Sequence, residues 1–246
     1  MRNFKMLLAY DGTRYQGWQR LSGNDNTIQG KLETALSRLL DQEVTVSGSG
    51  RTDAGTHARG QVASFHADTT LSPAALLRQL RQVLPEDIGV LSLEEAAPRF
   101  HARLNASVKT YQYRLWNSEA PCVFERRWVW VCPQQLDTEK MQAAAQLFLG
   151  QHDFLGFSAN KHSKKSTVRR IDAFTVERCG PEIRFTVTGD GFLHHMVRIL
   201  VGTLVEIGAG QREADSILDV LGSCCRADAG QTVPAKGLCL MEVRYH

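Results

Sequence analysis

The chain has 246 residues, of which 43% are hydrophobic and 22% charged, and its formal net charge is +3. This composition is typical of a globular protein and excludes an intrinsically disordered chain. The first apolar run, residues 6–9, is far shorter than the core of a signal peptide, and no segment approaches the ~20 apolar residues that span a bilayer. We therefore expect a soluble, cytoplasmic protein that has no membrane partner.

The first 105 residues alternate strand and helix signals. Apolar residues recur at helical spacing from Ile28, and Ser72 with Pro73 forms an N-cap and first-turn pair that opens a second helix. The expected strands are residues 4–10, 44–48, 61–67 and 88–96. The resulting order, β-α-β-β-α-β, predicts one ferredoxin-like unit.

A similar order begins again after residue 105. The expected strands are 110–116, 126–132, a hairpin of 172–179 with 182–189, and 238–245; the expected helices are 141–149, 192–207 and 217–221. Two related α/β halves, residues 1–105 and 106–246, are the simplest interpretation. A cleft between such halves is a natural place for a binding site.

The positive charge is concentrated in "NKHSKKSTVRR", residues 160–170, which carries five cations and no acid. Without these five residues the chain has 24 basic and 26 acidic side chains, so the whole positive excess lies in one segment. Such a cluster is expected for a polyanion partner. An ordinary solvated loop remains an equal alternative on charge alone.

The spacing of cysteines, histidines and glycines predicts neither a metal site nor a nucleotide site. The six cysteines include no CxxC pair, and the neighbours His194 and His195 would point about 100° apart on a helix. The glycine-rich stretch "GSGRTDAGTHARGQ", residues 48–61, lacks the Lys-Ser or Lys-Thr of a P-loop, and Asp53 stands where a dinucleotide fingerprint needs glycine. We therefore expect no metal and no cofactor.

The glycine-rich stretch instead presents one carboxylate, Asp53, between Arg51 and Arg59. Its glycines allow positive φ angles and the close approach of a bulky ligand. On residue type alone, a turn-forming aspartate that caps its own loop is the favoured alternative.

Five segments, in order, resemble the motifs of the tRNA pseudouridine synthase A family. "GRTDAGTHARGQV" resembles its long signature. The others are "YDGTRYQGWQR" at 10–20, "FHARLNASVKTYQY" at 100–113, "FLHHMVRILVGTLVEIGAG" at 192–210 and "PAKGLCLMEV" at 234–243. The resemblance covers essentially the full length of the chain.

The resemblance implies an α+β fold in which two ferredoxin-like halves form one continuous, mostly antiparallel sheet with a central cleft, and it implies a homodimer. The implied reaction converts uridine to pseudouridine at positions 38, 39 and 40 in the anticodon stem-loop of tRNA. The glycosidic C–N bond breaks, the uracil rotates, and its C5 joins the same ribose carbon. No cofactor is implied.

The resemblance also implies residue roles. Asp53 matches the catalytic aspartate, acting as nucleophile or as base, and Arg198 matches its ion-pair partner, which would hold the pKa of that carboxyl low. Arg51 matches the residue that fills the space left by the flipped base. Tyr111 matches the tyrosine that stacks on the extruded uracil, and Leu238 an apolar residue of the pocket floor. Arg59, Lys164, Lys165 and Arg169 are the expected further contacts with the tRNA.

Structural alternatives exist for these residues: an exposed helix charge for Arg198, and a core leucine for Leu238. Two other functions also remain open. The chain could be a related synthase that acts on other RNA positions, or an RNA-binding or RNA-folding protein without catalysis. An intact set of Asp53, Tyr111 and Arg198 argues against the second, because a pure binder does not need the acid.

Overall fold

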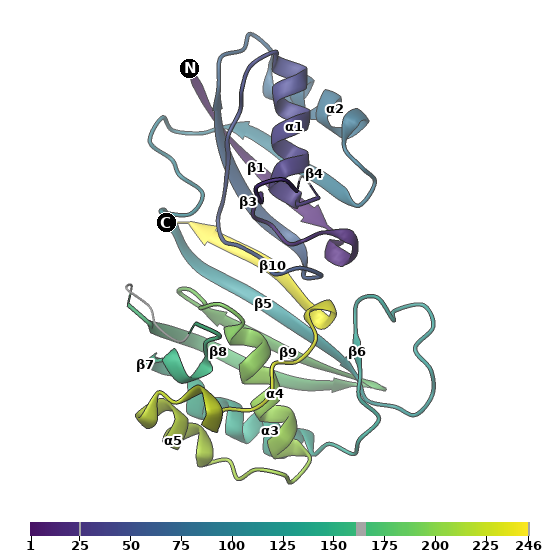
Figure 1. Ribbon diagram of the computed structural model, residues 1–246, viewed down its shortest axis with the longest axis vertical. Coiled ribbons are helices and arrows are strands. Elements are labelled where there is room, and N and C mark those ends of the chain that lie inside the picture. The colour runs from purple at the N-terminus through teal and green to yellow at the C-terminus, as the bar shows by residue number, and fades with distance from the viewer. Residues whose placement is uncertain (25, 161–165, 246) are drawn as a thin grey trace. The chain divides into compact units, whose positions relative to one another are not determined.

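The computed structural model describes residues 1–24, 26–160 and 166–245. The chain divides into two compact units (Figure 1). The first comprises Met1–Ser107 together with Cys239–His246, and the second comprises Val108–Leu238. The final strand therefore belongs with the first unit, although the segment that precedes it belongs to the second.

The sheet of the first unit has the strand order β4-β1-β3-β10, and β2 also pairs with β3. Its strands are β1 (Arg2–Tyr10), β2 (Val46–Gly48), β3 (His57–Ala67), β4 (Ile88–Glu95) and β10 (Leu238–Tyr245). β3 pairs antiparallel with β1 and β2, whereas β10 pairs parallel with its first residues, His57 and Ala58. The final strand thus lies beside the point at which β3 begins.

Two helices cover one face of this sheet, α1 (Ile28–Leu40) and α2 (Pro73–Val83) (Figure 1). The Thr27 hydroxyl accepts a hydrogen bond from the Gly30 amide, and the Ser72 hydroxyl accepts one from the Ala75 amide, so each helix begins at a capping side chain. The apolar side chains of both helices are fully buried at Leu32 and Leu80. The predicted β-α-β-β-α-β order is confirmed in this unit.

The sheet of the second unit has the order β5-β9-β8-β7, with β6 paired to β5. Its strands are β5 (Ala106–Trp116), β6 (Trp130–Val131), β7 (Gly150–Asp153), β8 (Val168–Cys179) and β9 (Glu182–Gly189). Its helices are α3 (Thr138–Ala145), α4 (Met196–Gly208) and α5 (Ser216–Ser223). The predicted hairpin of β8 and β9 is present, and the predicted α+β class with mostly antiparallel pairing is confirmed.

Five short 3-10 helices complete the described elements. They are Gly12–Arg14, Gln146–Phe148, Leu155–Phe157, Arg226–Asp228 and Ala235–Gly237. No helix in the described parts of the chain is long and apolar enough to cross a membrane.

Helix α4 begins four residues later than its apolar pattern predicts. His195, at its N-terminus, adopts a left-handed conformation with φ of 59°, so the helix cannot extend back to Phe192. Within α4, every residue except Arg198 and Glu206 is buried. A helix that is apolar on nearly all sides packs inside its unit, and Arg198 is therefore one of its two polar exceptions.

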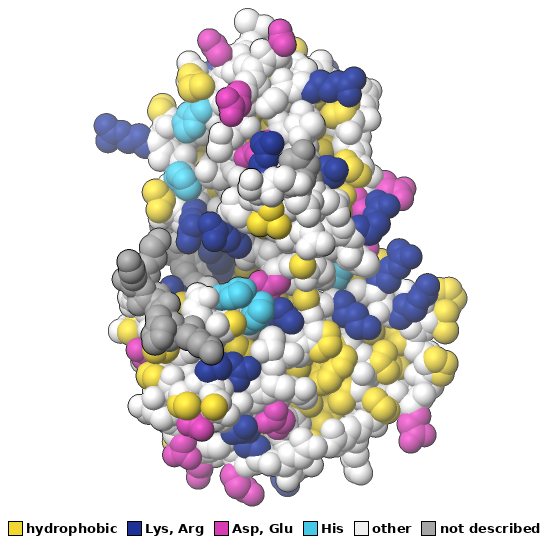
Figure 2. Space-filling model, in the orientation of Figure 1, with side chains coloured by type: hydrophobic (Ala, Val, Ile, Leu, Met, Phe, Trp, Pro, Cys, Tyr) yellow, Lys and Arg dark blue, Asp and Glu magenta, His cyan; other side chains and the backbone are white. Residues whose placement is uncertain are grey.

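The loop between β5 and β6 carries an exposed apolar surface. Phe124 is 88% exposed and Val123 56% exposed. The loop is nevertheless held, because the Arg114 guanidinium pairs with Glu125 at 2.9 Å and the Lys236 ammonium donates to the Arg126 carbonyl at 3.3 Å. In Figure 2 hydrophobic side chains gather at the lower right, where Figure 1 draws this loop.

Candidate active site

The Asp53 loop, residues 49–56, connects β2 to β3 and presents a half-buried carboxylate at its centre. Gln61, a fully buried residue of β3, holds the start of the loop: its amide nitrogen donates to the Gly50 carbonyl at 3.1 Å, and its amide oxygen accepts from the Ser49 hydroxyl. The Thr56 amide donates to the carbonyl of Asp53 at 3.1 Å. The loop is therefore fixed at both of its ends.

A second segment of the first unit, residues 11–18 between β1 and α1, packs against the Asp53 loop. The Trp18 amide donates to the Thr52 carbonyl at 3.0 Å, and the Gly55 amide donates to the Tyr15 carbonyl at 3.4 Å. The Gly12 amide donates to Nδ1 of His57 at 3.0 Å, at the point where β3 begins. These bonds bring together the two motifs that the sequence places 30 residues apart, "YDGTRYQGWQR" and "GRTDAGTHARGQV".

Two glycines permit this approach of one backbone to another. A Cβ atom on Gly12 would lie 2.0 Å from the Thr56 carbonyl oxygen, and one on Gly17 would lie 2.6 Å from the Thr52 carbonyl oxygen. Gly17 also has a φ of +89°, which L-residues with side chains rarely adopt. Any side chain at either position would push segment 11–18 away from the loop that carries Asp53.

Buried hydroxyl groups connect the loop to the sheet. The Tyr10 hydroxyl and the Thr52 hydroxyl lie 2.8 Å apart, and both residues are buried. Burial raises the pKa of the Tyr10 phenol far above its ordinary value, so the group stays neutral. The two arginines of the motif differ from these residues, since Arg51 in the loop and Arg59 on β3 are both exposed. Both therefore lie at the surface of the unit.

In the second unit, Tyr111 lies on β5 and is 6% exposed. Its ring meets the edge of the Phe192 ring, with centroids 5.2 Å apart and planes at 82°. Tyr113, two residues further along the strand, is fully buried, and its hydroxyl donates to the Pro234 carbonyl at 2.8 Å. The two tyrosines therefore differ: Tyr113 is a core residue with a satisfied hydroxyl, and Tyr111 packs against the segment that leads into α4.

Arg198 lies in the first turn of α4 and is half-buried. Its Nε donates to the Val233 carbonyl at 2.7 Å, and its own carbonyl accepts from the Val233 amide at 3.4 Å. The side chain is thus oriented by the segment that leads to Leu238, which is itself buried at 6% exposure. The motifs at 100–113, 192–210 and 234–243 meet within this unit through these contacts.

The two histidines before α4 differ from the sequence prediction. That prediction set His194 and His195 on a helix, with side chains turned apart. Both residues precede α4, and their rings lie 3.9 Å apart between centroids. His195 has a left-handed backbone conformation, so the spacing of side chains on a helix does not apply to this pair.

The expected phosphate contacts are only partly within the described residues. Arg169 lies on β8 and is half-buried, and its guanidinium donates to the carbonyls of Ser166 and Val168 at 3.0 and 2.6 Å. Lys164 and Lys165 lie outside the described residues. The structure thus brings Asp53 together with Thr52, Tyr15 and Trp18 in one unit, and Tyr111 and Arg198 with their neighbours in the other.

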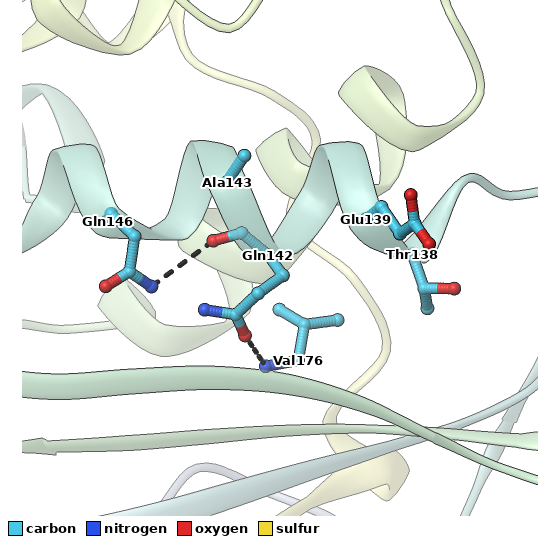
Figure 3. A pocket seen from close by; sticks show the side chains of 6 residues that line it. All are labelled: Thr138, Glu139, Gln142, Ala143, Gln146 and Val176. Carbon is cyan, nitrogen blue, oxygen red and sulfur yellow. Dashed lines mark hydrogen bonds between the residues drawn. The ribbon is translucent and has the colours of Figure 1, made fainter.

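An open hollow lies between α3 and β8 and contains none of the candidate residues. It is lined by Thr138, Glu139, Gln142, Ala143, Gln146 and Val176. The amides in it bind protein groups: Gln142 accepts from the Val176 amide at 2.6 Å, and Gln146 donates to the Gln142 carbonyl at 3.2 Å (Figure 3). With one carboxylate and amides already occupied, this hollow offers little for catalysis.

Comparisons with known proteins agree on one family. The model of the tRNA pseudouridine synthase family matches residues 6–105 and 144–246. A tRNA pseudouridine synthase A from Pelobacter propionicus is 44% identical over 245 residues, covering 100% of both chains. A tRNA pseudouridine synthase A 2 from Bacillus cereus and a tRNA pseudouridine synthase A from Acetivibrio thermocellus are each 42% identical over the same length and coverage.

Gly12→Ala tests the contact between segment 11–18 and the Asp53 loop. Because the new methyl group would meet the Thr56 carbonyl at 2.0 Å, we expect a loss of about 1–3 kcal/mol in the free energy of unfolding, measured by urea denaturation. Amide hydrogen exchange should become faster in residues 49–56. Gly89→Ala is the matched control, since a Cβ there has only the Ala9 carbonyl within 4 Å, at 3.8 Å. Equal stability of the two variants would contradict this account of the loop.

Proposed function

Since this chain belongs to the tRNA pseudouridine synthase family and converts uridine to pseudouridine in tRNA, we propose that its targets are uridines 38, 39 and 40 of the anticodon stem-loop. The motif resemblance over the full chain supports this choice of positions. The observation that supports catalysis at this site is the Asp53 loop, a half-buried carboxylate on a glycine-rich turn that the motif at 10–20 contacts through hydrogen bonds at Thr52 and Gly55.

Asp53 acts on the target nucleotide as nucleophile or base. The reaction is an isomerisation, so it consumes no second substrate: the glycosidic C–N bond breaks, the base turns, and a C–C bond forms to the same ribose carbon. A carboxylate must be ionised for either role, and an arginine beside it would favour the charged form. We assign this part to Arg198, whose guanidinium is held in place by the hydrogen bond from its Nε to the Val233 carbonyl.

Three further residues handle the base. A uridine in a stem must leave the helical stack before a protein can reach its glycosidic bond, at a cost of a few kcal/mol. Exposed Arg51 fills the vacated space, and Tyr111 stacks on the extruded uracil, an interaction worth ~1–3 kcal/mol per base. Buried Leu238 supplies an apolar floor for the same ring.

Phosphate contacts supply the affinity. Exposed Arg59 and the basic segment that includes Lys164, Lys165 and Arg169 bind the sugar-phosphate backbone, which is read by charge and shape rather than by base identity. These contacts hold the anticodon arm while the loop of Asp53 acts on one nucleotide.

The active form is a homodimer, and it works in the cytoplasm. The exposed Phe124 and Val123 on a loop held by Arg114 and Lys236 support self-association, since large exposed apolar surfaces on ordered segments mark protein interfaces. Sedimentation velocity should show one species at twice the chain mass of 27.4 kDa. A monomer at micromolar concentration would exclude the dimer.

Asp53→Asn tests the catalytic assignment. The substitution keeps the size and shape of the side chain but removes its charge, so pseudouridine formation in a single turnover with excess enzyme should fall by several powers of ten, at ~1.4 kcal/mol for each. Binding to tRNA should change only about threefold, because affinity comes mostly from phosphate contacts.

Two controls accompany this measurement. Asp68→Asn removes an exposed acid of the same unit and should leave the rate unchanged. A tRNA with cytidine at positions 38 to 40 should give no product with the natural enzyme. Product at normal rate from Asp53→Asn would remove Asp53 from the mechanism, and product from the cytidine-substituted tRNA would refute the choice of positions.

The triple change of Lys164, Lys165 and Arg169 to alanine tests the basic segment. Each lost phosphate contact should reduce the slope of log affinity against log salt by about 0.7–0.9. Turnover at saturating tRNA should remain close to that of the natural enzyme. If the salt dependence is unaltered, the segment makes no contact with the RNA.

A further inference from the structure

Asp87, which none of the motifs includes, lies directly before β4 and binds segment 11–18 with both its side chain and its backbone. One carboxylate oxygen accepts two hydrogen bonds from the Arg14 guanidinium, at 2.9 and 2.6 Å, and the other accepts one from the Tyr15 hydroxyl. The Asp87 carbonyl also accepts from the Asp11 amide at 3.0 Å. The side chain of Asp87 is only 12% exposed.

These bonds hold segment 11–18 at Asp11, Arg14 and Tyr15. The same segment contacts the Asp53 loop, since the Tyr15 carbonyl accepts from the Gly55 amide and the Trp18 amide donates to the Thr52 carbonyl. Tyr15 therefore connects Asp87 to the loop, because its hydroxyl binds the Asp87 carboxylate and its carbonyl binds the Gly55 amide. Displacement of Tyr15 would move the acceptor of Gly55, two residues from Asp53.

The bonds to Asp87 join a carboxylate to a guanidinium and to a buried phenol. Hydrogen bonds to an ionised carboxylate are shorter and about twice as strong as those between neutral groups. Tyr15 is 5% exposed, and burial together with its bond to Asp87 raises the pKa of its phenol, so that it stays protonated and donates at physiological pH. Arg14 is exposed, and its pKa is raised by the bond to Asp87, so it stays charged.

Buried acids elsewhere in the described residues have different partners. Glu33 on α1 accepts hydrogen bonds from the Val46 amide and from the side-chain amide of Gln29, and the first of these joins α1 to β2. Glu182 pairs with Arg114 and Arg184 and joins β9 to β5. Asp87 differs because its partners belong to the segment that braces the Asp53 loop.

We propose that Asp87 is a positioning residue for pseudouridine formation, which fixes the Asp53 loop through Tyr15 and Arg14. The inference rests on the proposed role of Asp53 and extends it. Catalytic groups must be held within a fraction of an ångström, and a displacement of about 1 Å can cost a hundredfold in rate. Asp87 touches no substrate in this account and acts only through segment 11–18.

The test uses Asp87→Asn and Tyr15→Phe in the full-length enzyme. Asp87→Asn keeps the volume but loses the charge, so the single-turnover rate should fall roughly 10- to 100-fold while tRNA affinity stays within about threefold. Tyr15→Phe removes one of the bonds and should give a smaller loss of the same kind. Glu94→Gln is the matched control, because Glu94 pairs with Lys5 across β4 and β1 without contact to segment 11–18. Its rate should equal that of the natural enzyme.

Hydrogen exchange provides a readout besides activity. In Asp87→Asn and Tyr15→Phe, residues 11–18 and 49–56 should exchange faster, while α2 and β3 exchange as before. A loss of rate without faster exchange in residues 49–56, or a loss matched by an equal loss of tRNA affinity, would overturn the positioning role. If Asp87→Asn unfolds, the result for Tyr15→Phe decides.

The experiments distinguish a failure of the role of Asp87 from a failure of the role of Asp53. A natural rate in Tyr15→Phe and Asp87→Asn, with Asp53→Asn inactive, would overturn the inference about Asp87 and leave the function of Asp53 standing. An active Asp53→Asn enzyme would instead overturn the proposed function on which the inference depends.

Discussion

The close approach of two backbone segments, residues 11–18 and 49–56, is the constraint on which the conformation of the Asp53 loop depends. The segments exchange backbone hydrogen bonds at Thr52 and Gly55, and they can do so only because positions 12 and 17 carry no side chain. A loop rich in glycine has a large conformational entropy in the unfolded chain. The bonds from the sheet and from segment 11–18 offset that cost and leave one conformation in which the carboxylate of Asp53 is presented.

This construction explains how a flexible sequence can hold one side chain in a fixed place. Precise placement of a reacting group normally requires a rigid element, and here a loop is made rigid by neighbours instead of by its own helix or strand. Gln61 holds one end from inside β3, and Tyr15 and Trp18 hold the other side. The side chain of Asp53 remains half-buried at the centre of this loop.

Local sequence signals predicted most elements because their physical causes are local. The pair Ser72 and Pro73 and the apolar periodicity from Ile28 predict the starts of α2 and α1, and the structure has both helices begin there. The same reasoning was wrong where backbone conformation overrides periodicity. The apolar run from Phe192 continues the pattern of α4, yet the left-handed His195 starts the helix at Met196. Strand β7 carries no clear pattern, because pairing with β8 forms it. Of the strand expected at residues 126–132, only β6 (Trp130–Val131) is present, where it pairs with β5.

The sequence by itself determined the fold class, the order of elements in the first unit and, through five motifs in order, the family and the candidate residues. These follow from residue type, periodicity and the identity of side chains, all of which are written in the chain. Only the tertiary structure decided two other features. These are the pairing of β10 with β3 in the first unit and the hydrogen bonds of Asp87 with Arg14 and Tyr15. Each joins residues more than 70 positions apart, and such pairs leave no mark on local periodicity because they are chosen by packing and hydrogen bonding in the folded chain.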